Sequence, residues 1–250
     1  MIPMCTLVAL YRTVPGYDIV LGMNRDEDRM RPAEPPQSLA GSPAIVAPRD
    51  ARAGGTWIGV NEAGLVAALS NRRERTSTTA RSRGQLMLDV LKLANVRAAE
   101  IAVQRAVSEH EYNFFNLMVA TREEMRFLTY DGQVRMARGH DGLNVLTNAG
   151  GNAEGDEKLA LIRSLGGALK FPDAAAATRW LEVTLRTHGG AGTPALCNHG
   201  AGGGTVSSTM LALHNAAPEE NVLLYADGSP CQAPYRDYSR LVQALKPGAR

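Results

Sequence analysis

The chain has 250 residues, and 27 lysines and arginines against 25 aspartates and glutamates leave a formal net charge of +2. This near balance excludes an extended basic surface for nucleic acid or for an anionic membrane. Hydrophobic residues make up 44% of the chain, yet no apolar run approaches the ~18 residues of a membrane span, so we expect a soluble protein.

The first part of the chain is predicted to form strands. Segments rich in β-branched and aromatic residues predict strands over 5–11, 18–23, 56–60 and 64–69. Val14-Pro15-Gly16-Tyr17 has turn chemistry, so the first two strands form a hairpin that carries Asn24-Arg25-Asp26-Glu27 at its exit. Four prolines between Arg29 and Pro43 exclude a helix there and predict a long surface loop.

The spacing of apolar residues changes to about 3.6 in the middle of the chain, which is typical of helices. The predicted elements are then helices over 84–94 and 97–109, strands over 115–120, 125–130 and 133–138, helices over 157–165 and 173–185, and strands over 204–213 and 221–226. Asp131-Gly132 predicts a type I′ hairpin between two of these strands.

Hairpins alternate with paired helices, without a βαβ repeat. This order favours an α+β fold in which two antiparallel sheets lie face to face under helix layers. Residues 1–250 contain no linker or internal repeat and are predicted to be a single domain. Residues 1–4 are a possible leader ahead of a later start, and residues 241–250 are predicted to be a loose tail.

The cysteine content favours reduced thiols in the cytoplasm. Cys5, Cys197 and Cys231 are odd in number and form no C-x-x-C pair, which argues against a disulfide framework and a zinc knuckle. The five histidines show no metal-ligand spacing. No metal and no cofactor is therefore predicted, and the N-terminal segment has no basic leader of a secretory signal.

Cys5 is the first candidate for chemistry. A free cysteine at the start of a strand is most often a small buried apolar residue. Met4 directly precedes it, however, so a start at Met4 or removal of a short leader would make Cys5 the N-terminal residue. An α-amino group titrates near pH ~8 and a thiol near ~8.5, so one residue would then supply a nucleophile and its own base.

Asp26, Asn71 and Asn148 are further candidates. The predicted hairpin sets Asp26 beside the start of the chain, where a carboxylate can orient the Cys5 amino group. Asn71 leaves a predicted strand and Asn148 stands in Leu146-Thr147-Asn148, so either can donate a hydrogen bond to an oxyanion. Each of the three residues is equally well explained as part of a solvated turn.

Several motifs occur together in a fixed order. They are Cys5-Thr6, Asn24-Arg25-Asp26-Glu27 followed by Arg31-Pro32, Gly54-Gly55-Thr56-Trp57-Ile58-Gly59-Val60, Ala68-Leu69-Ser70-Asn71-Arg72, Ser82-Arg83-Gly84, Gly142-Leu143-Asn144 with Asn148, and Gly204-Thr205-Val206-Ser207-Ser208-Thr209. Together they resemble the NRDE family, also called the Transport and Golgi Organisation protein 2-like family. The resemblance covers nearly the whole chain.

The resemblance implies a four-layer αββα fold of the N-terminal nucleophile hydrolase kind, related to the cysteine acylases that cleave bile-salt and penicillin amides. In that pattern the catalytic positions correspond to Cys5, Asp26, Asn71 and Asn148. The residues expected to contact substrate are Asn24, Arg25, Arg72 and Ser207.

Two positions depart from the relatives. Met23 stands where the acylases carry an arginine, and Arg25 is a candidate to replace it. Val206 stands where family members usually carry an arginine, so a bidentate clamp for a carboxylate is missing there.

Two functions of different classes follow. The first is a cysteine hydrolase or acyltransferase that acts on an amide or thioester of a small molecule, as an amidohydrolase of non-peptide C–N bonds. The second is a carrier or trafficking factor for a hydrophobic small molecule such as haem, to which family members have been linked.

Overall fold

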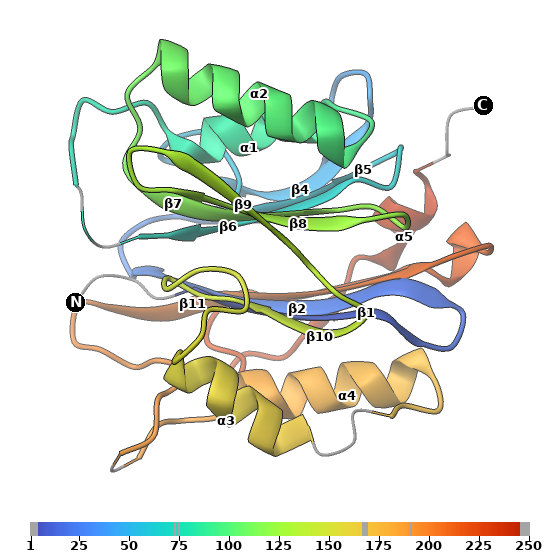
Figure 1. Ribbon diagram of the computed structural model, residues 1–250. Helices are drawn as coiled ribbons and strands as arrows, with labels where there is room; N and C mark the ends of the chain where they lie inside the picture. The colour runs from blue at the N-terminus through green and yellow to red at the C-terminus, as the bar shows by residue number, and fades with distance from the viewer. Residues whose placement is uncertain (1–4, 73, 75, 167–169, 191, 246–250) are drawn as a thin grey trace.

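Two antiparallel sheets lie face to face in the computed structural model, and a pair of helices covers the outer face of each (Figure 1). The structure describes residues 5–72, 74, 76–166, 170–190 and 192–245. The predicted four-layer αββα sandwich is confirmed. No helix among these residues is long and apolar enough to cross a membrane.

The first sheet has six strands in the order β10-β1-β2-β11-β12-β13. Its strands are β1 (Thr6–Val14), β2 (Tyr17–Asp28), β10 (Gly142–Leu146), β11 (Gly203–His214), β12 (Val222–Ala226) and β13 (Arg236–Asp237). The helices α3 (Glu157–Gly166) and α4 (Ala174–Leu185) cover its outer face. The short helix α5 (Ser239–Gln243) contacts both β12 and the 3₁₀ turn at Pro218–Glu220 that precedes β12.

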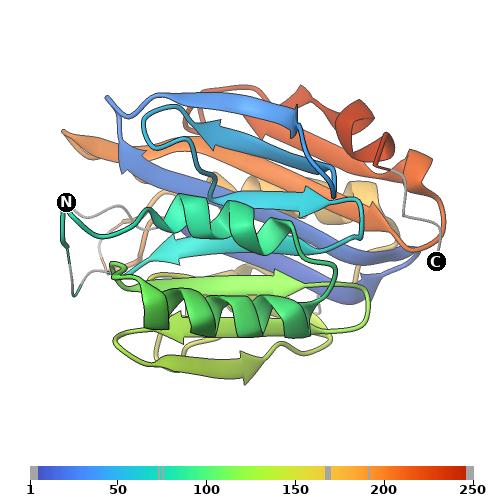
Figure 2. The same ribbon diagram turned by 90° about the horizontal axis from the view of Figure 1, so that it is seen from above.

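The second sheet has seven strands that follow one another in chain order. They are β3 (Ala33–Leu39), β4 (Ile45–Asp50), β5 (Ile58–Asn61), β6 (Val66–Asn71), β7 (Phe115–Ala120), β8 (Met125–Tyr130) and β9 (Val134–Arg138). Figure 2 shows α1 (Arg83–Leu91) and α2 (Val96–Glu109) lying across its outer face.

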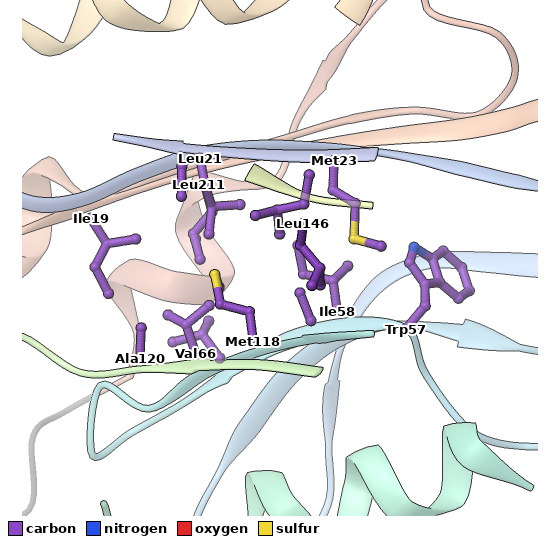
Figure 3. Packing of buried hydrophobic residues seen from close by; sticks show 14 of the residues in the cluster. Ile19, Leu21, Met23, Trp57, Ile58, Val66, Met118, Ala120, Leu146 and Leu211 are labelled. Atoms are coloured by element: carbon purple, nitrogen blue, oxygen red, sulfur yellow. The ribbon is translucent and has the colours of Figure 1, made fainter. Parts of the chain in front are cut away.

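The main core lies between the sheets (Figure 3). Along β2, Ile19, Leu21 and Met23 face this core, whereas Val20 packs in the cluster under α4. Because both faces of β2 are covered there, its sequence is continuously apolar from Ile19 to Met23 instead of alternating. Trp57 lies beside Met23 at one end of the inter-sheet cluster, and Cys5 belongs to the same cluster.

The proline-rich segment is partly a strand, and the prediction of a surface loop over residues 29–43 is wrong for Ala33–Leu39. This strand, β3, lies at the edge of the seven-stranded sheet, and its pairing with β4 shifts register between Glu34 and Gln37. Pro35 and Pro36 occupy this shift. Proline lacks an N–H, and it is tolerated at edges and bulges for that reason.

The charged quartet 24–27 lies inside β2 and not at its exit, because β2 continues to Asp28. The second half of the strand pairs with β11, with Asn24 opposite Ser208 and Asp26 opposite Thr205. Charged residues at the end of an apolar run indicate a turn when the chain is considered alone. Here β11 supplies both the strand partner and hydrogen-bonding side chains.

Smaller corrections concern turns and late elements. The Asp131–Gln133 connection is a three-residue loop instead of a two-residue type I′ turn, because Tyr130 pairs with Val134. The strands β4, β10 and β13 are not predicted from the sequence.

The prediction of a loose tail is wrong over 241–245, since Leu241 and Leu245 pack on the inter-sheet core. Residues 1–4 and 246–250 lie outside the described part.

Two glycines bring α1 close to the segment before β5. A Cβ on Gly55 would lie 2.3 Å from the backbone carbonyl carbon of Gly84. The N–H of Thr56 donates to the carbonyl of Gly84 at 3.1 Å. Backbone therefore packs on backbone here, which explains why both motifs carry glycine at these positions.

Replacing Gly55 with alanine is expected to lower the free energy of unfolding by about 1–3 kcal/mol, because the added methyl group forces the two backbones apart. Urea unfolding of the variant and the wild type measures the loss. Gly202→Ala is the matched control, since a Cβ there meets nothing within 4 Å, and its effect should stay within about 0.5 kcal/mol. Equal losses in the two variants would contradict this account.

Candidate active site

Cys5 lies directly before β1, at the edge of the inter-sheet core. The pairing of Thr6 with Asn24 brings it beside the charged end of β2, as the hairpin prediction expects. Its side chain is 5% exposed, and Sγ lies 3.8 Å from the backbone carbonyl oxygen of Asp26. Burial, and then the Asp26 carboxylate, raises the pKa of the Cys5 thiol to about 12. The thiol is therefore protonated at neutral pH and needs a base.

A cavity of about 300 Å³ opens beside Cys5. Its walls come from the end of β2, the segment before β5, the end of β6 and residues 77–84. Charged and polar side chains dominate these walls. The residues that the chemistry below uses are Cys5, Arg25, Asp26, Trp57, Asn71 and Arg83.

Asp26 is 2% exposed and is held by side chains from another segment. Thr205 Oγ1 donates to its Oδ1 at 2.6 Å, and Asn198 Nδ2 donates to its Oδ2 at 2.5 Å. Hydrogen bonds of this kind stabilise the ionised carboxylate. The carboxylate is thus fixed in one orientation next to Cys5.

Asn71 and Asn148 are in contact, but only Asn71 lines the cavity. Asn71, at the end of β6, lines the cavity. Asn148 lies behind it and donates through Nδ2 to the backbone carbonyl of Asn71. Asn116 of β7 in turn donates to the carbonyls of Thr147 and Asn148, at 3.0 Å each. Asn148 is not among the cavity's lining residues, so in this geometry it positions Asn71.

Of the four residues expected to contact substrate, the structure brings only Arg25 into the cavity. Its guanidinium stacks 4.2 Å from the centre of the Trp57 ring. The side chain of Asn24 points to the other face of the sheet, where Nδ2 donates to the carbonyls of Leu185 and Leu196 at 2.8 and 2.9 Å. Asn24 therefore ties β2 to the helix layer.

The other two expected contacts also lie elsewhere. Arg72 pairs with Glu74 at 2.5 Å and is not a lining residue. Ser207 is 1% exposed in the interior beside β2 and does not reach the cavity. Its position follows from the pairing of β11 with β2, which no local pattern in the sequence indicates.

Arg83 is a cavity residue to which the sequence assigns no role. It stands at the start of α1, where Nη1 donates to the carbonyl of Phe114 at 2.9 Å. Burial lowers the pKa of its guanidinium, while the nearby Glu27 and Cys5 act in the opposite direction. The motif Ser82-Arg83-Gly84 is the signal that marks it in the sequence.

Arg31 and Asp50 form an ion pair in the cavity wall. Arg31 Nε and Nη2 donate to Asp50 Oδ2 at 2.9 and 2.6 Å, and the N–H groups of Arg52 and Ala53 donate to Oδ1. Burial acts to raise the pKa of Asp50, but the hydrogen bonds from Arg31 and the backbone outweigh it and lower the pKa below its ordinary value.

This pair predicts a pH-dependent loss of stability. A carboxyl with a lowered folded-state pKa stabilises the fold above its unfolded pKa of about 3.9, and the contribution is lost as the pH falls through the folded value. Asp50→Asn should therefore lower the free energy of unfolding by on the order of 1 kcal/mol at pH ~7. The difference from wild type should shrink below pH ~4. Urea unfolding across this range measures it, and a difference that stays constant contradicts the prediction.

The family model described as Transport and Golgi organisation 2 matches residues 4–182. The chain belongs to this family. The Transport and Golgi organization protein 2 homologs of Bos taurus and Homo sapiens are each 32% identical to it over 109 residues, which are 42% of this chain and 39% of theirs. The match thus spans about two fifths of the curated relatives.

Solved structures show the fold of this family member. A Caenorhabditis elegans N-acylethanolamine-hydrolyzing acid amidase ortholog superposes with a TM-score of 0.60 at 15% identity, over 83% of this chain and 92% of that one. Penicillin V acylase from Agrobacterium tumefaciens gives 0.53 at 15% identity, over 89% and 83%. A variant of conjugated bile acid hydrolase from Clostridium perfringens gives 0.55 at 14% identity, over 94% and 93%. The fold is that of N-terminal nucleophile hydrolases.

Proposed function

We propose that the protein is a cysteine N-terminal nucleophile hydrolase that cleaves an amide bond of a small anionic molecule. The observation that carries the proposal is the position of Cys5 at the cavity, with Asp26 fixed beside it. The three structural neighbours described above are an amidase, an acylase and a hydrolase, which supports this class. A thioester substrate, or acyl transfer to an amine, would use the same groups.

The proposed reaction requires prior hydrolysis of the Met4–Cys5 peptide bond, in which water adds to the Met4 carbonyl carbon and the released nitrogen becomes the α-amino group of Cys5. This amine accepts the thiol proton, and Asp26 orients the resulting ammonium group. The thiolate attacks the carbonyl carbon of the amide, and Asn71 donates to the oxyanion. The leaving amine departs with the proton from the ammonium group. Water then hydrolyses the thioester and regenerates Cys5.

Two arginines in the cavity support an anionic substrate. Arg25 and Arg83 have no carboxylate partner among the residues that the structure describes, although Arg31 nearby is neutralised by Asp50 and Glu27. Guanidinium groups in such a position favour a carboxylate or a similar planar anion. We infer that the substrate carries its anionic group on the side of the cavity where Arg83 lies.

Arg83→Gln is expected to raise KM for a substrate with a carboxylate by about 10- to 100-fold, from the ~1.5–3 kcal/mol of a hydrogen bond to a charged group. An otherwise identical substrate with a neutral methyl ester serves as the control, because its KM should change little. Steady-state kinetics on both substrates measures the difference. A similar rise in KM for the ester would show that Arg83 acts through the structure of the cavity and not through charge.

The charged walls of this cavity also bear on the alternative function. A carrier for a hydrophobic molecule such as haem would need apolar walls, so the cavity beside Cys5 favours the hydrolase. The proposal keeps the cytoplasmic location predicted from the cysteine content, since thiols stay reduced there. The trafficking role in the family name does not require a different site.

The proposal is tested with two forms of the chain, one that begins at Met1 and one that begins at Cys5. Each is incubated with a panel of N-acyl amino acids, and intact mass spectrometry detects an acyl group on the protein. Only the form that begins at Cys5 should gain the acyl group and release the amine. Acylation of another residue, or equal turnover by both forms, would refute the proposed mechanism.

A further inference from the structure

Two cysteines and two histidines converge at one point outside the cavity beside Cys5. His188 follows α4, Cys197 and His199 precede β11, and Cys231 follows β12. The ligand atoms of the four side chains all lie within 4.8 Å of one another. No spacing in the sequence indicates this group, because its members come from three separate segments.

The separations between these ligand atoms are close to those around a tetrahedral zinc ion. The sulfur atoms of Cys197 and Cys231 lie 3.5 Å apart, and the Nε2 atoms of His188 and His199 lie 3.3 Å apart. His199 Nε2 lies 3.7 Å from Cys197 Sγ and 3.2 Å from Cys231 Sγ. Zn–S bonds of ~2.3 Å and Zn–N bonds of ~2.0–2.1 Å place tetrahedral ligand atoms roughly 3.3–3.8 Å apart.

Hydrogen bonding alone does not explain this arrangement. Three groups approach His199 Nε2, namely both sulfur atoms and His188 Nε2. A neutral ring nitrogen carries either one proton or one lone pair, so it satisfies one such partner. A disulfide does not explain it either, because the sulfur atoms are far beyond the ~2.05 Å of an S–S bond. Four groups with available electron pairs around one point are the arrangement that a metal ion requires.

We propose that His188, Cys197, His199 and Cys231 bind one zinc ion. A tetrahedral set of two sulfur and two nitrogen ligands is typical of zinc. Both thiols lose their protons to solvent on binding, and both imidazoles bind in the neutral form. Because protein side chains fill all four coordination positions, the ion has no open position for a substrate, and its role is structural.

The position of the site indicates what the ion would stabilise. Asn198 stands between two of the ligands, and its side chain donates to Asp26. Ser229, two residues before Cys231, donates to the carbonyl of Thr205 at 2.6 Å, and Thr205 also donates to Asp26. Zinc would therefore link the segment that carries Asn198 to the segment that hydrogen-bonds Thr205, and both Asn198 and Thr205 hold the Asp26 carboxylate. The importance of this link for catalysis rests on the proposed function, whereas the binding of zinc does not.

Metal analysis of the full chain, purified under reducing conditions after growth with zinc, tests the site directly. We expect one zinc per chain by inductively coupled plasma mass spectrometry. Cobalt(II) added to the metal-free protein should give the visible bands of a tetrahedral site and a thiolate-to-cobalt charge-transfer band. Competition with a coloured zinc chelator measures the affinity of the wild type without any variant.

Variants identify the ligands. Cys197→Ser and Cys231→Ser should lose most of the bound zinc and the charge-transfer band. His188→Gln changes an exposed side chain, so it should fold normally and bind zinc at least tenfold more weakly. His110→Gln and Cys5→Ser are the matched controls and should retain one zinc per chain.

Several results would overturn the proposal. They are a reduced, folded wild type that binds neither zinc nor cobalt, a zinc content that survives both cysteine substitutions, and a cobalt spectrum without thiolate ligation. A failure of the proposed hydrolase appears separately, because zinc content and the cobalt spectrum do not depend on turnover. A protein that binds zinc but never forms an acyl-enzyme would thus reject the hydrolase alone.

Discussion

Replacing Cys5 with alanine is expected to abolish acyl-enzyme formation and to lower kcat on the order of 10⁴–10⁶-fold, the scale seen when a hydrolase loses its nucleophile. The thiol lies at the cavity, next to Asp26, and alanine offers no atom that can attack a carbonyl carbon. The variant should be made in the form that begins at residue 5, so that the α-amino group is still present. Intact mass after mixing with substrate and steady-state turnover measure the loss.

The fold must be shown to survive this change. Cys5 is a small side chain that is 5% exposed, so its truncation should cost only about 1 kcal/mol of stability, and circular dichroism and urea unfolding check this. Cys5→Ser is a second variant that keeps the size of the side chain but carries a weaker nucleophile. If Cys5→Ala hydrolysed the substrate at the wild-type rate, Cys5 would not be the nucleophile.

The raised pKa of the Cys5 thiol also predicts how fast Cys5 reacts with an alkylating agent in each form of the chain. Burial, followed by the Asp26 carboxylate, raises the pKa of this thiol to about 12 in the chain where Cys5 follows Met4. Alkylation of Cys5 should therefore be slow at neutral pH in that form, because the thiolate is the reactive species. The form that begins at Cys5 should react faster, since its own amine can accept the proton.

Replacing Asp26 with asparagine should lower kcat by roughly 10²–10⁴-fold and change KM less, the range expected when a group that orients a catalytic base is lost. The carboxylate accepts from Thr205 and Asn198. An amide in its place presents N–H groups to at least one of these donors and loses the charge that orients the Cys5 ammonium group. Steady-state kinetics on the form that begins at Cys5 measures the effect.

Asp28→Asn is the matched control for this change. Asp28 lies on the same strand, its replacement removes the same charge, and it is exposed at the end of β2. This variant should keep kcat within a factor of about two, because surface substitutions away from a site have small effects. If both variants lost activity equally, net charge near the cavity would explain the loss and not the position of Asp26.

Part of the site follows from the sequence because it depends on local structure. Thr6 and Asn24 belong to adjacent strands joined by a tight turn at Pro15-Gly16, so the hairpin brings Cys5 to the end of β2 by itself. The helices are also predictable, because their apolar residues recur at helical spacing over two or more turns. The ordered motifs identified the family, which the family model confirms over residues 4–182.

Other features depend on segments that are far apart in the chain. The β3 strand contains prolines that argue against it, and it forms because an edge position with a register shift needs fewer N–H donors. Asn24 belongs to the charged Asn24-Arg25-Asp26-Glu27 motif, but its side chain points to the helix layer because strand side chains alternate between the two faces of a sheet. Asn148 likewise reaches Asn71 only through the loop that follows β10.

The sequence by itself determined the fold class, the family and the hairpin that joins Cys5 to the charged end of β2, because these depend on short-range periodicity and on residues close in the chain. Only the tertiary structure decided which side chains share the cavity, and that His188, Cys197, His199 and Cys231 meet. The reason is physical. The pairing of β2 with β11 and the packing of α1 on the second sheet set these neighbours, and both are long-range contacts that no local pattern encodes.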